Sequence, residues 1–537
     1  MFVRPRFLLR RHFILLLALS TCGLTFSLAQ SNRQRFIPPS TEWLHLDSRS
    51  PYKIWLDQDV PWIITDEERA AFKLLRSDEE RDSFIDAFWS RRDPTPDTLM
   101  NEYKIEHYHH IVYANEQFGI AGVPGWKSDR GRIYIMHGQP DQVESFPGSG
   151  EGIPVAKNRD VIESFPAVKD PNLNPADAAA RLPLEVWHYR YLEGVGQDVT
   201  LRFVDTCWCG DFRMTMDPAE KGTLLYFPGD WHRTGKDRIA AVPPPVFTWG
   251  TRPTAKFLDL KKYIHGYVNL NPLPFEVRAD VIKATDATSL LPITIAIRNR
   301  DITFVEDHER RRATLNISGQ LVTPSDHVIE EFEDSIDLNL GAGESSSKED
   351  RTLYILALAP RNDHYRLEIA IKDVHANRGG SLVTPLDIPD RPGTSFSTSS
   401  LVLAERIDPV SRDVDASGFV RLGSFYIRPY VGTEGEPLHV ARGKEHFFWM
   451  QIYDLAVDQK ARRTSVQVDY TIAEIATNKI VFHEQLPADA GQALRDQLTL
   501  RQKLPADLKP GSYRLDVQVR DGISDEALQR STVFVID

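Results

Sequence analysis

Three side chains on one predicted helix have the types and spacing of metal ligands. Glu102, Glu106 and His109 lie four and three positions apart within residues 98–118, so a helix would present them on one face. Carboxylate and imidazole groups bind divalent cations, and a bound cation can activate water for hydrolysis. One function open to this sequence is therefore a metal-dependent hydrolase that uses Glu102, Glu106 and His109.

The same residues also fit a structural network, and we favour this interpretation. The sequence has no second helix with a matching Glu-x-x-His pair, which a di-metal helix bundle would need. Charged groups persist inside a protein when they are paired and hydrogen-bonded. The expected network pairs Arg91, Arg92 and Arg130 with Asp93, Glu102, Glu106 and Asp129. We accordingly assign no metal, no cofactor and no catalytic residue.

Two cysteines flank one tryptophan in Cys207-Trp208-Cys209. On an extended strand both sulfurs would face the same side, with their α-carbons about 6 to 7 Å apart, at the limit for a disulfide. A strained or turn-based disulfide and two free thiols therefore both remain open. Two thiolates alone make an incomplete zinc site.

Local motifs of the common enzyme classes are missing from the sequence. It contains no Gly-x-Ser-x-Gly elbow, no phosphate-binding glycine loop before Lys-Ser/Thr, no His-Glu-x-x-His and no pair of Cys-x-x-Cys motifs. This favours a non-enzymatic role over an enzyme.

A glycine-framed turn precedes the segment 132–137, which we predict to be a strand. Two glycines allow close backbone approach, an indole can fill a core, and an acidic residue beside cations can join a polar network. These signature residues are Gly125, Trp126, Ser128, Asp129, Arg130 and Gly131. We predict that the turn is structural, with Trp126 buried in the core.

Together with the upstream segment, this turn resembles the bacterial GWxTD domain family. The resemblance is carried by Phe88-Trp89, Arg92-Asp93-Pro94-Thr95-Pro96, Asn101-Glu102-Tyr103, Glu106-His107-Tyr108, Ala114-Asn115, Phe118 and residues 125–132. Ser128 stands where the family name has threonine, and it keeps a hydroxyl that can bond a nearby backbone group. The resemblance is strong over residues 55–145. It implies an exported bacterial protein and supplies no established activity.

The elements around the turn follow from capping and periodicity. Thr65 to Glu68 and Ser77 to Glu80 are capping boxes, and a third helix is expected over 98–118. Strand patterns at 185–191 and 199–205 should form a small sheet with 132–137. Residues 146–182, which connect the predicted strands 132–137 and 185–191, are expected to form a long loop. A groove between this loop and the sheet is the expected ligand site.

Downstream of residue 243 the pattern changes to alternating strands with an internal repeat. The segment 364–373 matches 512–521, and 293–297 parallels 448–452. Tyr513, just after Pro510-Gly511, resembles the late-strand tyrosine of immunoglobulin-like or fibronectin-like modules. We therefore predict a multidomain α+β protein: N-terminal helices packed on a small sheet, followed by two antiparallel β-sandwich modules. A barrel stays open as an alternative.

The first residues have the three parts of an export signal. Four arginines, an apolar stretch from Ile14 to Leu28 and the small-x-small site Ser27-Leu28-Ala29 predict cleavage after residue 29. Lipidation at Cys22 is the minor alternative. The predicted domains are then a GWxTD-type domain at 40–235, a first sandwich at 243–405 and a second at 420–537.

The net charge of the chain limits the classes of partner that it is expected to bind. Removal of residues 1–29 takes away four arginines and no acidic residue, which lowers the net charge from −12 to −16. An acidic chain argues against nucleic acid as the partner, and no membrane-spanning segment is expected after cleavage. We expect a periplasmic or extracellular protein of the bacterial cell envelope that binds a protein or envelope partner.

Overall fold

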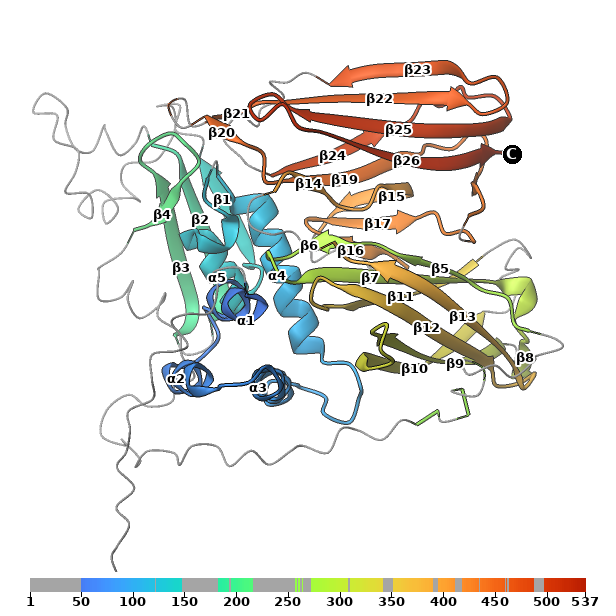
Figure 1. Cartoon of the computed structure of the whole chain (residues 1–537), viewed down its shortest axis with the longest axis horizontal. Coiled ribbons are helices and arrows are strands. Elements are labelled where there is room, and N and C mark those ends of the chain that lie inside the picture. The colour runs from blue at the N-terminus through green and yellow to red at the C-terminus, as the bar shows by residue number, and fades with distance from the viewer. Residues whose placement is uncertain are drawn as a thin grey trace, which may run out of the picture. The chain divides into compact units, whose positions relative to one another are not determined.

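Local sequence signals start the helices near the expected positions. The Thr65 hydroxyl accepts a hydrogen bond from the Glu68 amide while the Glu68 carboxylate accepts one from the Thr65 amide, and Ser77 and Glu80 repeat this exchange. Asn101 caps the next helix through the Lys104 amide. These helices, blue in Figure 1, are α1 (Pro51–Ile54), the π-helical turn Trp55–Asp59, α2 (Asp66–Leu74), α3 (Asp78–Ser90) and α4 (Glu102–Phe118).

The computed structural model describes the chain from residue 50 onward, with gaps. The described residues are 50–120, 122–146, 182–192, 195–215, 256–257, 259–260, 263, 272–307, 310–340, 351–389, 395–410, 418–433, 435–458, 460, 463–486 and 497–537. The predicted signal at 1–29, the lipidation alternative at Cys22 and nearly all of the predicted loop 146–182 lie outside these residues, so they stay predictions.

The segment 132–137 is helical, and our prediction of a strand there was wrong. After a short 3-10 turn (Gly125–Lys127), helix α5 spans Asp129–His137 and ends at Gly138, which adopts a positive φ of 73°. Ser128 caps the helix. Ile133, Tyr134 and Ile135 are all buried, so the apolar run reflects a helix enclosed on several sides and not one face of a strand.

The small sheet has four antiparallel strands in sequence order, and it confirms the two strands predicted at 185–191 and 199–205. In place of the 132–137 segment, β1 and β4 complete it. The strands are β1 (Gln142–Phe146), β2 (Leu184–Leu192), β3 (Gly196–Asp205) and β4 (Phe212–Met214). Trp187 and Phe203 from this sheet join the same buried cluster as Phe88 and Tyr134 from the helices.

Strands β5 to β13, which we call the first β module, form two antiparallel sheets around one core. One sheet has the order β11-β7-β5 with β6 beside β7, and the other has the order β10-β9-β12-β13 with β8 beside β9. Ile295 of β7 and Ile369 of β12 lie in the same buried cluster. The strands are β5 (Glu276–Ala279), β6 (Ile282–Lys283), β7 (Ser289–Arg298), β8 (Val305–Asp307), β9 (Arg310–Val322), β10 (Val328–Leu340), β11 (Arg351–Leu358), β12 (His364–Asp373) and β13 (Arg378–Asp387), with a 3-10 turn at Asn299–Asp301.

Strands β14 to β26 form the second β module, again with a core shared by two sheets. Their orders are β14-β19-β15-β17-β16, with β24 beside β19, and β18-β26-β25-β22-β23; the β18–β26 pair is parallel. The strands are β14 (Ser397–Thr398), β15 (Val402–Pro409), β16 (Val420–Leu422), β17 (Phe425–Pro429), β18 (Leu438–Val440), β19 (Phe447–Tyr453), β20 (Val457–Asp458), β21 (Arg463–Thr464), β22 (Val466–Glu474), β23 (Lys479–Leu486), β24 (Leu498–Lys503), β25 (Gly511–Asp521) and β26 (Ala527–Ile536).

The internal repeat appears in the hydrogen bonds of the two modules. Tyr365 donates its hydroxyl hydrogen to the backbone oxygen of Arg361, four residues earlier, and Tyr513 does the same to Lys509. Equivalent strands also follow the same order, because β10-β9-β12-β13 corresponds to β23-β22-β25-β26. The segments matched by sequence, 364–373 and 512–521, are β12 and β25 in these positions.

The observed class is α+β, with helices near the N-terminus followed by mostly antiparallel sheets. β14 and β15, which precede residue 410, pair with β17 and β19 and so belong with the later strands. The domain boundaries remain predictions. Among the described residues, no helix is long and apolar enough to cross a membrane.

Candidate functional site

The signature turn is held by close backbone contacts. A Cβ atom at Gly125 would lie 1.8 Å from the backbone oxygen of Ala114, and one at Gly131 would lie 1.9 Å from that of Gly125. Only glycine fits both positions. Ser128 donates its hydroxyl hydrogen to the Gly125 oxygen at 2.8 Å and accepts the Gly131 amide at 3.0 Å. The hydroxyl therefore fills the backbone-bonding role expected of it.

Trp126 packs inside the helical region, as predicted. Its side chain is 6% exposed and lies near Trp62, whose indole nitrogen donates to the Trp126 backbone oxygen at 3.0 Å. The Trp126 amide in turn donates to Asn115 Oδ1 on α4. The Asn115 amide group continues the chain of contacts to the backbone oxygen of Ala284 in the first β module. The turn is therefore a structural junction.

Asp129 and Arg130 hold the small sheet, which the sequence did not predict. Asp129 is buried and accepts the backbone amide of Met214 on β4 at 2.9 Å. Arg130 pairs with Glu185 on β2 at 2.7 Å and donates to the backbone oxygen of Gly210 at 3.3 Å. Burial lowers the pKa of Arg130, while the neighbouring Glu185 opposes that effect. The expected pairing of Arg130 with carboxylates of the helices was wrong because the sheet supplies its partner.

Arg92 and Asp93 also differ from the expected network. Arg92 pairs with Glu68 on α2 at 2.7 Å, and Arg91 reaches the same carboxylate at 2.9 Å. Asp93 accepts the Thr95 amide within the turn after α3. The arginines thus bind the residue that also completes the α2 capping box, so one carboxylate fixes both the start of α2 and the end of α3.

Glu102, Glu106 and His109 each meet a different set of neighbours. The Glu102 carboxylate accepts hydroxyl hydrogens from Thr95 and Thr98. Burial alone would raise the pKa of Glu106, but its bond with His110 and the charge of Arg421 hold that pKa below its usual range.

His109 and the remaining ligand candidates complete this picture. Burial lowers the pKa of His109 to about 3. Across the described residues, one group of three or more His, Cys, Asp or Glu side chains places its ligand atoms within 4.8 Å of one another, and it consists of Asp205, Cys207 and Cys209. The geometry therefore gives the Glu102, Glu106 and His109 alternative no gathered ligand set.

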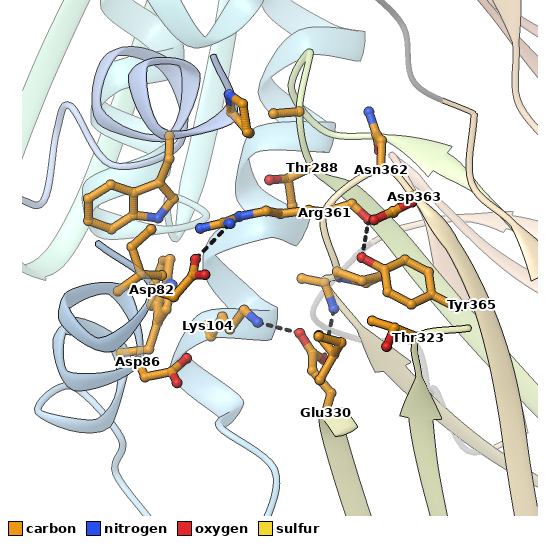
Figure 2. A pocket seen from close by; sticks show the side chains of 18 of the residues that line it. Asp82, Asp86, Lys104, Thr288, Thr323, Glu330, Arg361, Asn362, Asp363 and Tyr365 are labelled. Atoms are coloured by element: carbon orange, nitrogen blue, oxygen red, sulfur yellow. Dashed lines mark hydrogen bonds and ion pairs between the residues drawn. The ribbon is translucent and has the colours of Figure 1, made fainter. Parts of the chain in front are cut away.

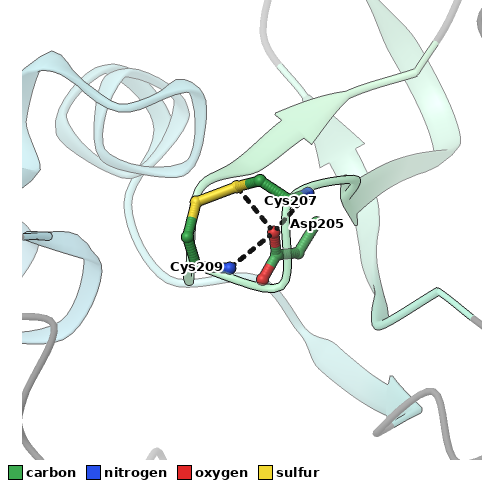
Figure 3. A group of neighbouring side chains, drawn as sticks. All are labelled: Asp205, Cys207 and Cys209. Carbon is green, nitrogen blue, oxygen red and sulfur yellow. Dashed lines mark hydrogen bonds between the residues drawn. A yellow bond between two sulfur atoms is a disulfide. The ribbon is translucent and has the colours of Figure 1, made fainter. Parts of the chain in front are cut away.

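Cys207 and Cys209 form a disulfide in the turn between β3 and β4 (Figure 3). Their α-carbons lie 5.1 Å apart, closer than on an extended strand, because Trp208 between them adopts a positive φ of 56°. Of the two states left open by the sequence, the turn-based disulfide is the observed one. Asp205 lies beneath the turn, buried, and accepts the amides of Cys207, Cys209 and Gly210 at 3.1, 3.2 and 2.7 Å.

A cavity of about 420 Å³ lies between the helices and the first β module (Figure 2). Asp82 of α3 reaches across it to Arg361 at 2.8 Å, and Lys104 of α4 pairs with Glu330 of β10. Its labelled charged groups are thus largely engaged in bridging the two regions. The predicted groove beside residues 146–182 falls outside the described residues.

Comparison with known proteins identifies one domain. A model of the GWxTD domain matches residues 53–151. No curated protein matches the chain. Solved structures that it resembles include two of the β-glucuronidase of Parabacteroides merdae, one of them with glycerol in its active site. Each is 11% identical over 46% of this chain, with TM-scores of 0.17 and 0.16.

The chain spans 28% and 27% of the length of these enzymes, and at such TM-scores the likeness carries no argument about fold or function. The GWxTD match covers the capped helices, the Gly125 turn and α5. It also covers the resemblance read from the sequence at 55–145. The chain is therefore a GWxTD domain-containing protein, with that domain at residues 53–151.

Proposed function

We propose that this protein is an exported, non-enzymatic interaction protein of the bacterial cell envelope, which binds a protein partner at the outer edge of β23. In this proposal the β modules are immunoglobulin-like or fibronectin-like units. The support is that the hydroxyls of Tyr365 and Tyr513 each bond a backbone oxygen four residues earlier, as in the tyrosine corner of such units. The export signal and the periplasmic or extracellular location belong to the same proposal. The observation that carries it is that the edge strands of the two modules differ in their contacts with the rest of the chain.

Residues that precede β5 contact both edge strands of the β10-β9-β12-β13 sheet. At the β10 edge, Glu333 accepts the backbone amides of Lys256 and Phe257. Along β13, the backbone oxygen of Gly379 accepts the Leu273 amide. Such contacts occupy part of each edge strand and hinder the addition of another chain there.

The equivalent sheet of the second module is covered at one edge. There β18 pairs with β26, while β23 ends the sheet and no described residue pairs with its outer side. Ile480 and Val481 of β23 are 57% and 44% exposed. An extended segment with apolar side chains can add to such an edge through main-chain hydrogen bonds and cover these two residues.

Acidic groups further along the same two strands indicate the character of the segment. Glu484 lies three residues beyond Val481 on β23, and Asp469 of β22 pairs with Gln485 and contacts His483. Together with the acidic net charge of −12, this favours a partner strand that alternates apolar and basic residues. Lys479 is the first residue of β23, so it would lie at one end of the contact with the partner strand.

Site-specific crosslinking in the native envelope tests the proposal. A photoreactive residue at Val481 should form an adduct with one partner protein, mapped to an extended segment. The same residue at Val383 of β13, which is 48% exposed in the first module, is the matched control and should form none. Ile480→Lys should abolish the Val481 adduct without lowering the thermal midpoint, because a charge on an edge strand opposes strand addition.

Two results would reject the proposal. One is an adduct that persists in Ile480→Lys, and the other is crosslinking of Val481 only to this chain's own residues. The metal-dependent hydrolase is less well supported, because Glu106 is engaged with His110 and Arg421. Metal analysis of the purified protein and of Glu106→Gln addresses it directly: stoichiometric metal that is lost in the variant would favour it.

A further inference from the structure

We propose that Cys207 and Cys209 are a redox-active pair that oxidises a dithiol in another protein by thiol–disulfide exchange. This activity is independent of partner binding at β23. The disulfide closes over a single intervening residue and stands in a surface turn between the antiparallel strands β3 and β4 (Figure 3). A crosslink here would add little to the stability of the fold. The loop that it closes has one intervening residue, and the entropic stabilisation from a disulfide is smallest for the shortest loops.

The two sulfurs differ in access, which determines the direction of attack. Cys207 is exposed, whereas Cys209 is half-buried. Thiol–disulfide exchange begins when a thiolate reaches one sulfur of the disulfide. An incoming thiolate therefore meets Cys207 first, and Cys209 is the leaving sulfur.

Trp208 gives the exposed sulfur a surface on which a polypeptide can dock. Its side chain is 55% exposed although it is one of the largest apolar groups in the chain, and its positive φ of 56° is uncommon for a bulky residue. Local backbone strain of this kind persists where surrounding contacts hold it and is frequent at functional sites. A large exposed ring beside an accessible disulfide suits a protein substrate better than a small thiol.

The turn is held by contacts that do not involve the sulfur–sulfur bond. Asp205 accepts three backbone amides of the turn, and Arg130 of the signature donates to the Gly210 oxygen. When the disulfide opens, these contacts remain. The two sulfurs then stay close enough to close again, which is what a reversible pair requires.

Asp205 also acts on the reduced form. Its Oδ1 atom lies 3.2 Å from Cys207 Sγ. A Cys207 thiol can donate its hydrogen to this carboxylate, while the negative charge disfavours the Cys207 thiolate. Cys207 thus leaves the reaction as a protonated thiol, and Asp205 is the group that receives its hydrogen bond.

The reaction balances within the two proteins. A partner thiolate attacks Cys207 Sγ, a mixed disulfide forms, and the electron pair of the Cys207–Cys209 bond leaves on Cys209. The second partner thiolate attacks its own sulfur in the mixed disulfide and releases Cys207. The partner loses two electrons and two protons and becomes a disulfide, while Cys207 and Cys209 gain them as thiols.

The test uses the full oxidised protein and a synthetic reduced peptide that carries two cysteines separated by two residues. Intact-mass measurement after acid quenching should show the protein gaining two hydrogens and the peptide losing two. Cys209→Ser, converted at Cys207 to an activated mixed disulfide, should be resolved by the peptide at least tenfold faster than Cys207→Ser converted at Cys209. Equal rates, or a disulfide that the peptide leaves intact, would overturn the proposal.

Two further measurements separate an active pair from a structural crosslink. After reduction, circular dichroism and the thermal midpoint should stay close to those of the oxidised protein; loss of the folded GWxTD domain would make the disulfide structural. In a glutathione buffer at pH 7, Asp205→Asn should shift the equilibrium toward the disulfide, because the reduced form loses the charge-assisted hydrogen bond from the Cys207 thiol to the carboxylate. A shift toward the dithiol would contradict the assigned role of Asp205.

Discussion

The two β modules share their interior and differ at their surfaces. Asp373 at the end of β12 and Asp521 at the end of β25 are both fully buried, and each accepts three backbone amides. In the first module other residues contact both edge strands of this sheet, whereas no described residue pairs with the outer side of β23 in the second. In two copies of one plan, the contacts that satisfy buried groups stay the same, while the edges differ. The difference therefore points to the edge as the place where a specific function can arise.

Removal of either buried carboxylate is the strongest way to break this equivalence. Asp373→Ala and Asp521→Ala would each leave three backbone amides without an acceptor, at a cost of about 3 to 5 kcal/mol in the free energy of unfolding. Urea unfolding with hydrogen exchange resolved by module measures each loss. The two costs should agree within about 1 kcal/mol. A much smaller cost for one variant would mean that Asp373 and Asp521 do not stabilise their modules to the same extent, although their hydrogen bonds are similar.

The repeat and the helix starts were predictable because they depend on local signals. Capping boxes such as Thr65 to Glu68 act within one turn, and Tyr365 and Tyr513 bond four residues back. Helix α5 was missed because buried Ile133, Tyr134 and Ile135 show no amphipathic period, and periodicity alone does not separate a buried helix from a strand.

Long-range partners could not be predicted for a different reason. Arg130 had several carboxylates available in the sequence, and the fold selects Glu185, which lies 55 residues away. Glu116 of α4 reaches Ser424 and Thr499, more than 300 residues away. Any acidic residue satisfies the chemistry of such a pair, so only the tertiary arrangement decides which one does.

Among the contacts of the helical region with each module is one buried carboxylate, and these two carboxylates should respond differently to loss of charge. Glu116 accepts the Ser424 amide at 2.7 Å and the Thr499 hydroxyl at 2.8 Å. Glu116→Gln replaces one of its two acceptor oxygens by a donor group and should cost about 1.5 to 3 kcal/mol.

Asp59, at the contact with the first module, is the matched counterpart. It accepts hydroxyl hydrogens from Tyr108 and Thr288, and burial raises its pKa despite these bonds. Asp59→Asn keeps an acceptor oxygen and removes a charge that burial penalises, so the change at pH 7 should stay below about 1 kcal/mol. Equal losses for Glu116→Gln and Asp59→Asn, measured by urea unfolding, would remove this distinction between the contacts.

Acid should lower the stability of the helical region through His107. This side chain is buried on α4, its Nε2 lies 2.6 Å from the Asp59 backbone oxygen, and burial lowers its pKa from 6.5 to about 4. Below pH 6.5 the unfolded chain binds a proton that the folded protein excludes, so stability falls as the pH drops toward 4. The contribution is about 1.4 kcal/mol per pH unit.

His107→Gln isolates this contribution, because glutamine keeps a donor for the Asp59 oxygen and does not titrate. Unfolding free energies measured from pH 6.5 to 4.5 should show a smaller slope in the variant than in the unmodified chain. Asp59 acts in the opposite direction, since a carboxyl with a raised pKa gains stability as the pH falls through it. The same slope in both proteins would mean that His107 is protonated in the folded state.

The smallest expected effect comes from removing the tyrosine hydrogen bond that the two modules share. Tyr365→Phe and Tyr513→Phe each remove one hydroxyl that donates to a backbone oxygen at 3.0 and 2.8 Å. Each should cost about 0.5 to 1.5 kcal/mol, measured by urea unfolding with hydrogen exchange resolved by module. The loss should be confined to the module that carries the change, because each bond closes a loop of four residues. If Tyr365→Phe also loosened the second module, the two units would unfold as one, and the comparison between them would apply to their sequences but not to their stability.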